Sequence, residues 1–314
     1  MQQLHSNKFN DFDDEIDLQE IFNVLFKGKW IIVSLTVMIS IIGLIYSLSL
    51  PNVYQSKAVL VSSNPSSSIS AALGGFSSLA GIAGIGLPSD GENDNTAKAM
   101  QKIGSLSFFE NNILPNIYLP NLMAIKSWNY KTNTLTFDEN TYDMSINSWV
   151  RDYSYPQQQI PSAQESFEEF TKKNLSLSED KKSGFITLSI KHQSPFIAKQ
   201  WVELIVNEIN TFYRQKDKLQ SEKAVSYLNE QISMTSLTEI KEALAKLLQE
   251  EIKKLTLIEA NQHYVFDYVD PPAVMEKKSE PKRALIFIVS VLLGGMLSVF
   301  LVLIRHYVIK KRVT

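Results

Sequence analysis

Two apolar runs without any charged side chain stand near the two ends of the chain. Residues 30–50 (WIIVSLTVMISIIGLIYSLSL) and residues 284–304 (ALIFIVSVLLGGMLSVFLVLI) are each 21 residues long. At 1.5 Å per residue, an α-helix of this length spans roughly 30 Å, the thickness of the hydrocarbon layer of a bilayer. The pattern therefore predicts two transmembrane helices. A cleaved signal peptide, the alternative for the first run, has a shorter apolar region.

Cations flank both predicted spans on the side of the chain termini. Lys27 and Lys29 precede the first span, and four cations follow the second: Arg305, Lys310, Lys311 and Arg312. Short cytoplasmic segments are enriched in Lys and Arg, so both termini are expected to be cytoplasmic. Four other cations precede the second span: Lys277, Lys278, Lys282 and Arg283. They end a long loop, and long loops cross the membrane largely regardless of charge.

The predicted organisation follows from these spans. It comprises a cytoplasmic head with an interfacial helix (1–29), transmembrane helix 1 (30–50), a periplasmic domain (51–283), transmembrane helix 2 (284–304) and a cytoplasmic tail (305–314). Within the periplasmic domain, residues 51–194 and 260–283 form a base, and residues 195–259 form a long helical hairpin. In a Gram-negative bacterium, the exterior of the inner membrane is the periplasm.

Alternating apolar positions predict the strands of the base. They cover residues 54–62, 185–191 and 264–269, with a short strand at residues 135–137. Helices are predicted at residues 96–114 and, from a capping box formed by Ser162 and Glu165, at residues 162–173. The first and last strands both adjoin the membrane, and pairing them would close the domain at its base. The fold class is therefore α+β.

The longest helical pattern begins at Pro195. Its first apolar stripe is Trp201, Ile205, Ile209 and Phe212, and a later one is Val225, Leu228 and Ile232. Between them, residues 214–223 contain one apolar residue, so the helix there must extend into solvent or face another polar helix. Ser236 and Glu239 have the spacing of a second capping box, before a third stripe of Leu237, Ile240, Leu244 and Leu247. We expect a hairpin packed through Leu228, Ile232, Leu237 and Leu244.

Prolines and small residues mark the approach to the second span and the spans themselves. Pro271, Pro272 and Pro281 block helix formation before the second span. Gly294 and Gly295 in this span, with small residues such as Gly43 in the first span, would let the helices approach closely; lipid-facing positions are the alternative.

Composition and motif searches exclude several classes of function. Lys and Arg total 31 against 33 Asp and Glu, a balance that argues against nucleic acid as a partner. The chain has no cysteine, and its four histidines are scattered. Residues 81–86 (GIAGIG) do not match a phosphate loop, and residues 11–17 (DFDDEID) lack the glycine of a calcium loop. We expect no catalytic residue, no cofactor and no metal.

Residues 58–89 carry no charged side chain, and the Gly- and Ser-rich segment 62–91 leaves two interpretations open. It forms either a flexible loop or a contact segment in an oligomer or near the membrane.

An ordered set of segments resembles the Wzz family of bacterial polysaccharide co-polymerases, the O-antigen chain-length determinants. The segments are DEIDLQEIF at residue 14, YQSKAVLV at 54, SEDKKSGFITLSI at 178, SYLNEQI at 226, YVFDYVDPPAV at 264 and PKRALI at 281. The family's segment before the second span usually has more prolines than this chain has.

The resemblance implies a membrane-bound homo-oligomeric ring, each protomer having an α/β base and a long periplasmic helix. It implies a Wzy-type polymerase as partner, and a lipid-linked glycan is a further candidate ligand. It implies no reaction for the chain itself. One alternative is an enzyme, because related capsule co-polymerases carry a cytoplasmic tyrosine kinase; residues 305–314 hold no Walker loop, so this alternative requires a separate kinase chain that docks on the tail. The other is a periplasmic sensor, for which the expected head and tail are too short to form an output module.

Overall fold

The structure is a computed structural model that describes residues 18–63 and 92–313. The chain divides into two compact units, Met1–Pro51 with Glu280–Thr314, and Asn52–Ser279. The acidic residues 11–17, residues 64–91 of the Gly- and Ser-rich stretch, and His5 lie outside the described residues.

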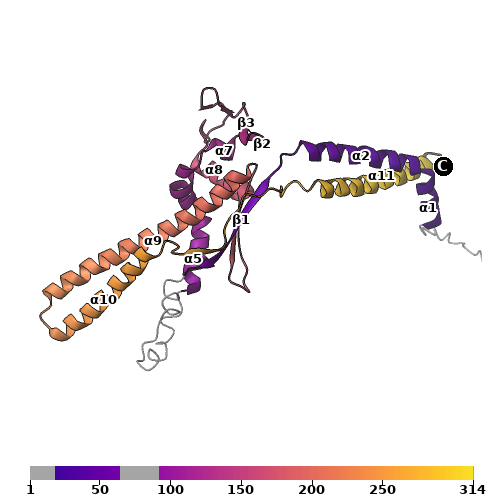
Figure 1. Cartoon of the computed structure of the whole chain (residues 1–314). Coiled ribbons are helices and arrows are strands. Elements are labelled where there is room, and N and C mark those ends of the chain that lie inside the picture. Colours follow the sequence, from indigo (N-terminus) through magenta and orange to yellow (C-terminus); the bar gives the residue numbers. More distant parts are fainter. Residues whose placement is uncertain (1–17, 64–91, 314) are drawn as a thin grey trace, which may run out of the picture. The chain divides into compact units, whose positions relative to one another are not determined.

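Three helices form the first unit. They are α1 (Leu18–Lys27), α2 (Lys29–Ser49) and α11 (Arg283–Val313), and α2 and α11 run side by side (Figure 1). Lys29–Ser49 and Arg283–His306 are long and apolar enough to cross a membrane. Most of their large apolar side chains are exposed, as expected of helices whose surroundings are lipid.

An antiparallel sheet of four strands lies at the centre of the second unit. Its order is β6 (Leu175–Glu179), β7 (Ile186–His192), β1 (Tyr54–Ser62) and β8 (Phe266–Asp270). The first and last strands pair, with Leu60 opposite Tyr268, as the sequence predicts. The fold class is α+β, in agreement with the sequence.

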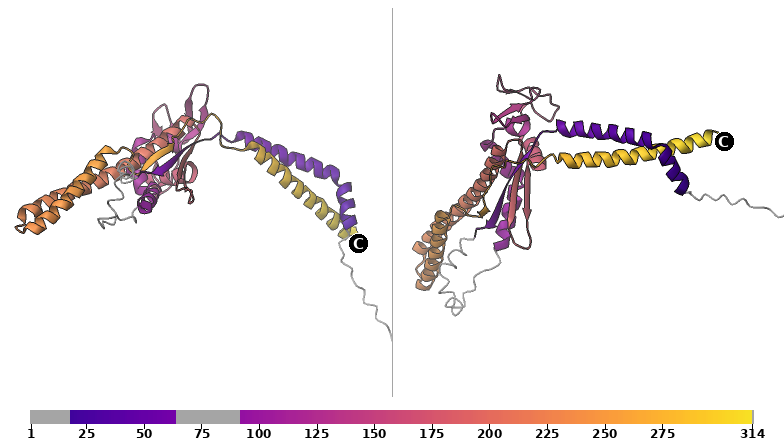
Figure 2. Two further views of the ribbon diagram at one scale, coloured as in Figure 1. Left: turned by 60° about the horizontal axis from the view of Figure 1, so that its bottom comes forward. Right: turned by 45° about the vertical axis from the view of Figure 1, so that its right-hand side comes forward.

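Helix α9 (Pro195–Met234) covers this sheet with its first half and continues beyond it (Figure 2). Trp201, Ile205 and Ile209 are buried in one core with Leu188 and Ile190 of β7. The second half of α9 runs beside α10 (Thr238–Ala260), and the two helices together form the predicted hairpin.

The helix predicted at residues 96–114 is broken in the structure. It consists of α5 (Glu92–Ile103), α6 (Leu106–Phe108), a π-helix η1 (Phe109–Ile113) and a 3₁₀-helix η2 (Leu114–Asn116). The break lies at Gly104 and Ser105, because the Ser105 hydroxyl accepts a hydrogen bond from the Phe108 N–H at 3.3 Å and starts a new helix. The π-turn then brings both Phe108 and Phe109 into the core.

Residues 117–160, where the sequence gives one short strand, contain small elements around a separate core. They are α7 (Pro120–Met123), β2 (Ile125–Asn129), β3 (Thr134–Phe137), β4 (Tyr142–Asp143) and β5 (Ser148–Trp149). Their core is Ala124, Tyr142 and Trp149.

The two predicted capping boxes have different outcomes. Ser162 caps α8 (Ala163–Glu169), accepting a hydrogen bond from the Glu165 N–H at 3.2 Å, and a π-helix, η3 (Phe170–Asn174), follows. The box predicted at Ser236 is wrong: α10 begins at Thr238 with Leu237 as N-cap, and no side chain caps it. Thr235 and Ser236 belong to the short linker that follows Met234. Ser236 therefore lies one position before Leu237, the N-cap residue of α10.

Candidate functional site

The seam between α9 and α10 has the spacing of an antiparallel coiled coil. On α9, the residues shielded from solvent recur at intervals of three and four: Lys218, Ser221, Val225, Leu228 and Ile232. On α10, the corresponding set is Leu244, Leu248, Glu251, Leu255 and Ile258. This 3.5-residue period keeps one stripe of each helix facing its partner. The seam is partly polar, and Lys218 forms an ion pair with Glu259.

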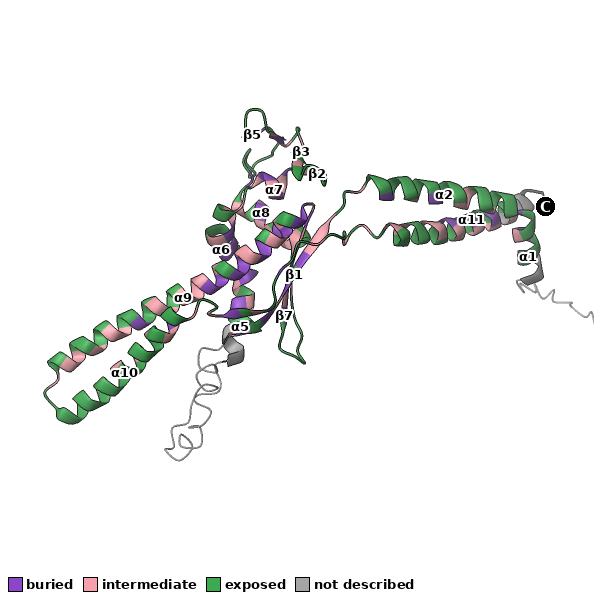
Figure 3. Ribbon diagram, in the orientation of Figure 1, coloured by how far each residue is buried: buried purple, intermediate pink, exposed green. Residues whose placement is uncertain are grey.

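The four predicted packing residues of the hairpin differ in burial. Leu228, Ile232 and Leu244 are half-buried, whereas Leu237 is 58 % exposed (Figure 3). Leu237 lies at the distal turn, where α9 has already ended. With Met234 and Ile240, it makes up an exposed apolar group that we call the hairpin tip.

Asn210 joins the base of the hairpin to the sheet. Its side chain is buried, and its Nδ2 donates a hydrogen bond to the Phe266 carbonyl at 2.9 Å. Its Oδ1 accepts from the N–H groups of Val265 and Phe266 at 2.7 and 2.9 Å. One amide thus satisfies three backbone groups where the chain returns from α10 to β8. Sequence reasoning misses Asn210, because its partners are more than fifty positions away.

His192 is buried at the end of β7 and makes two hydrogen bonds. Its Nδ1 accepts from the Ser194 N–H at 2.9 Å, which leaves Nε2 to donate to the Asn121 carbonyl at 3.0 Å. Burial lowers the pKa of His192 because it disfavours the charged imidazolium. The neutral ring therefore links α7 to the start of α9.

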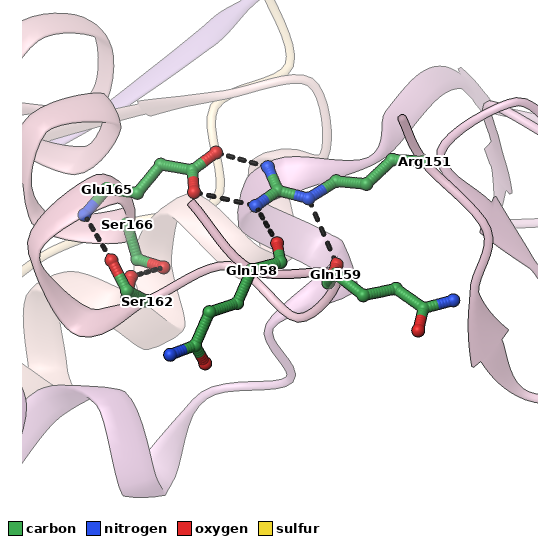
Figure 4. Close-up of polar contacts among 6 residues, drawn as sticks. All are labelled: Arg151, Gln158, Gln159, Ser162, Glu165 and Ser166. Atoms are coloured by element: carbon green, nitrogen blue, oxygen red, sulfur yellow. Dashed lines mark hydrogen bonds and ion pairs between the residues drawn. The ribbon is translucent and has the colours of Figure 1, made fainter. Parts of the chain in front are cut away.

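Arg151 holds the segment between β5 and α8 (Figure 4). Its guanidinium binds both carboxylate oxygens of Glu165 and donates to the carbonyls of Gln158 at 2.6 Å and Gln159 at 3.0 Å. The hydrogen bond to Glu165 raises the pKa of Arg151. Glu165 thus does not reach back to Ser162 as in a full capping box, and the pair acts as a structural clamp.

Small residues lie where α2 and α11 pack. A Cβ atom on Gly43 would stand 2.0 Å from the Ser290 hydroxyl, and one on Gly294 would stand 3.1 Å from Ile39. The hydroxyls of Thr36 and Ser298 share a hydrogen bond of 3.2 Å. Gly295 differs, because a Cβ there would meet nothing within 4 Å. Of the two predicted glycines, the structure places only Gly294 between the helices.

The proline segment before α11 is irregular. Pro272 is buried, Pro271 is exposed, and Pro281 precedes the first residue of α11 by two positions. Residues 18–63 and 92–313 hold no group of three acidic or imidazole side chains placed to bind a metal ion. The described residues offer packing surfaces and buried hydrogen bonds.

Two family models match parts of the chain. The family model Wzz, described as chain length determinant protein, matches residues 14–102. A second model, GNVR, described as a G-rich domain on a tyrosine kinase, matches residues 229–307. No curated protein sequence matches the chain.

Two solved structures are similar in outline. A full-length bacterial polysaccharide co-polymerase is 14 % identical, with a TM-score of 0.43, covering 94 % of this chain and 99 % of that one. A fragment of WzzB, a polysaccharide co-polymerase from Salmonella Typhimurium, is 11 % identical, with a TM-score of 0.32, covering 73 % and 100 %.

The Wzz family model matches α1, α2 and β1, together with all but the last residue of α5. These elements include the head, the first span and the strand on which the sequence resemblance depends. The resemblance to the Wzz family of chain length determinant proteins is therefore confirmed, and the matching family model covers residues 14–102 of the chain.

Proposed function

We propose that the chain is a non-enzymatic scaffold of the bacterial inner membrane. In this role it sets the modal chain length of O-antigen, or a related surface polysaccharide, made by a Wzy-type polymerase. The single observation that carries the proposal is the Wzz match across the first span and β1. The paired apolar helices and the long hairpin support it, because they suit a membrane-anchored scaffold.

The proposed orientation places both termini in the cytoplasm and residues 51–283 in the periplasm. Lys27 and Lys29 before α2, and the cations from Arg305 onward, favour this orientation. The proposed domains are those predicted from the sequence: the head (1–29), the two spans (30–50 and 284–304), the periplasmic base and hairpin (51–283) and the tail (305–314).

A homo-oligomeric ring is part of the proposal. The hairpin tip exposes Met234, Leu237 and Ile240 at 69, 58 and 46 %. Clustered exposed apolar side chains are typical of contact surfaces. We propose that a second copy of the chain covers them, so that the ring presents the polymerase, and a lipid-linked glycan, with repeated binding surfaces.

The proposal is tested by deleting the gene and separating the lipopolysaccharide on a gel. Loss of the modal band pattern is expected, and an unchanged pattern would overturn the proposal.

Complementation with Leu228→Asp, which places a charge in the hairpin seam, is expected to lose oligomer formation or length control. Ser226→Asp adds the same charge at an exposed position and serves as the matched control. A Leu228→Asp protein with normal oligomer size and modal length would show that the seam is not needed.

The GNVR match favours one second candidate, docking of a tyrosine kinase. In that case the chain would regulate polysaccharide length together with an ATP-binding partner. Co-purification of the full chain with such a protein would support this function, and its absence from cross-linked preparations would argue against it.

A further inference from the structure

A basic segment stands immediately before the second span. Residues 277–283 (KKSEPKR) contain four cations and one acid, and we call them the basic segment. In the proposed orientation these cations lie on the periplasmic side, where cations near a span are not enriched. Membrane insertion does not require cations on the periplasmic side of the second span, and therefore the orientation of the chain does not explain the basic segment.

Hydrogen bonds hold the first half of the basic segment against the chain that leaves the first span. The Ser279 N–H donates to the Val53 carbonyl at 2.8 Å, and the Ser279 hydroxyl donates to the same oxygen at 3.1 Å. Lys278 Nζ donates to Asn52 Oδ1 at 3.1 Å. Lys277 and Lys278 are therefore fixed beside residues 52 and 53.

Chain connectivity places these amines near the membrane surface. Asn52 follows Ser49, the last residue of α2, by three positions, so the two lie at most about 11 Å apart. Lys282 directly precedes Arg283, the first residue of α11. With α2 and α11 as the two spans, the cations stand within a few residues of the ends of these helices, where lipid headgroups supply phosphates.

We propose that the basic segment binds the phosphate groups of lipids. An ammonium group binds phosphate as a compact point charge with three donors. Two sources carry the same chemistry: the headgroup of an anionic phospholipid, and the phosphate that joins a glycan to its polyprenyl carrier. Capture of the second would hold the growing glycan beside the ring. The periplasmic placement rests on the proposed function, whereas phosphate binding does not.

The test uses the full chain in neutral detergent and native mass spectrometry. The ligands are phosphatidylglycerol, polyprenyl phosphate and, as the comparison that has no phosphate, diacylglycerol. The variant is Lys277→Gln with Lys278→Gln and Lys282→Gln. A matched control removes three exposed lysines of α10, with Lys241→Gln, Lys246→Gln and Lys253→Gln. A second variant, Lys277→Gln with Lys282→Gln, leaves the bond from Lys278 to Asn52 in place.

Each cation near an anionic lipid surface strengthens binding by roughly fivefold. The triple variant is therefore expected to bind at least one of the two phosphate lipids tenfold or more weakly than the control, and the double variant several-fold more weakly. The lipid that loses binding identifies the source. Equal binding by variant and control, or equal retention of diacylglycerol and the two phosphate lipids, would overturn the proposal. Neither result depends on orientation, so neither touches the proposed function.

Discussion

At the scale of single residues, the amide of Asn210 ties the return strand β8 to α9. Asn210→Leu keeps the volume but leaves the buried N–H groups of Val265 and Phe266 without an acceptor. The expected loss of stability is roughly 2–4 kcal/mol, because each buried unsatisfied group carries its full desolvation cost. Thermal unfolding of the purified full chain should show a transition several degrees lower. Asn229→Leu changes an exposed amide on the same helix and should leave the transition in place. Equal transitions for the two variants would contradict the role of Asn210.

His192 predicts a pH dependence of stability. Its pKa is lowered in the folded chain, so the unfolded chain binds a proton more readily. The stability from the neutral ring is fully present above pH of about 6.5, the usual pKa of histidine, and is lost as the pH falls towards the lower folded value. His192→Gln should flatten this part of the stability profile between pH 7 and 5. A profile that is unchanged in His192→Gln would contradict the assignment.

At the scale of elements, the packing of α2 against α11 depends on Gly43. A larger side chain there would collide with Ser290, so Gly43→Leu is expected to force the helices apart. The chain has no cysteine, and therefore the pair Thr36→Cys and Ser298→Cys can report this distance by disulfide formation. Gly43→Leu should abolish the cross-link, whereas Gly295→Leu, at an open position, should preserve it. An intact cross-link in Gly43→Leu would show that the helices do not pack as described.

Elements with a regular period could be predicted from the sequence. The spans, β1, β7 and the hairpin follow from apolar runs and stripes, which report burial directly. The hairpin also explains the polar residues 214–223 of α9. Lys218 forms an ion pair with Glu259 of α10, and Asp217 accepts a hydrogen bond from Tyr264 in the segment that follows α10.

The remaining elements depend on contacts that local sequence does not encode. Strands β4 and β5 have two residues each, too few for a period. The sequence pattern around Ser105 is that of a continuous helix, but the Ser105 hydroxyl accepts a hydrogen bond from the Phe108 N–H, and a new helix starts there. Leu237 has the sequence spacing of the apolar stripe on α10, yet its side chain is exposed, because α9 ends at Met234 and provides no residue to cover it. Asn210 and Arg151 act through partners that only the fold brings together.

At the scale of the whole molecule, the account rests on two spans that hold one translocated domain. Absence of cysteine makes single-cysteine labelling a direct test. Lys131→Cys in the base and Lys246→Cys in the hairpin would mark the large domain, and Ser6→Cys would mark the head. All three are expected to be inserted normally, because each replaces a polar residue outside the spans.

The most direct measurement exposes spheroplasts, which retain only the inner membrane, to a maleimide that cannot cross it. The account predicts labelling of Lys131→Cys and Lys246→Cys in intact spheroplasts, and labelling of Ser6→Cys only after the membrane is opened. Protection of the first two positions, or release of the chain into the soluble fraction, would contradict it.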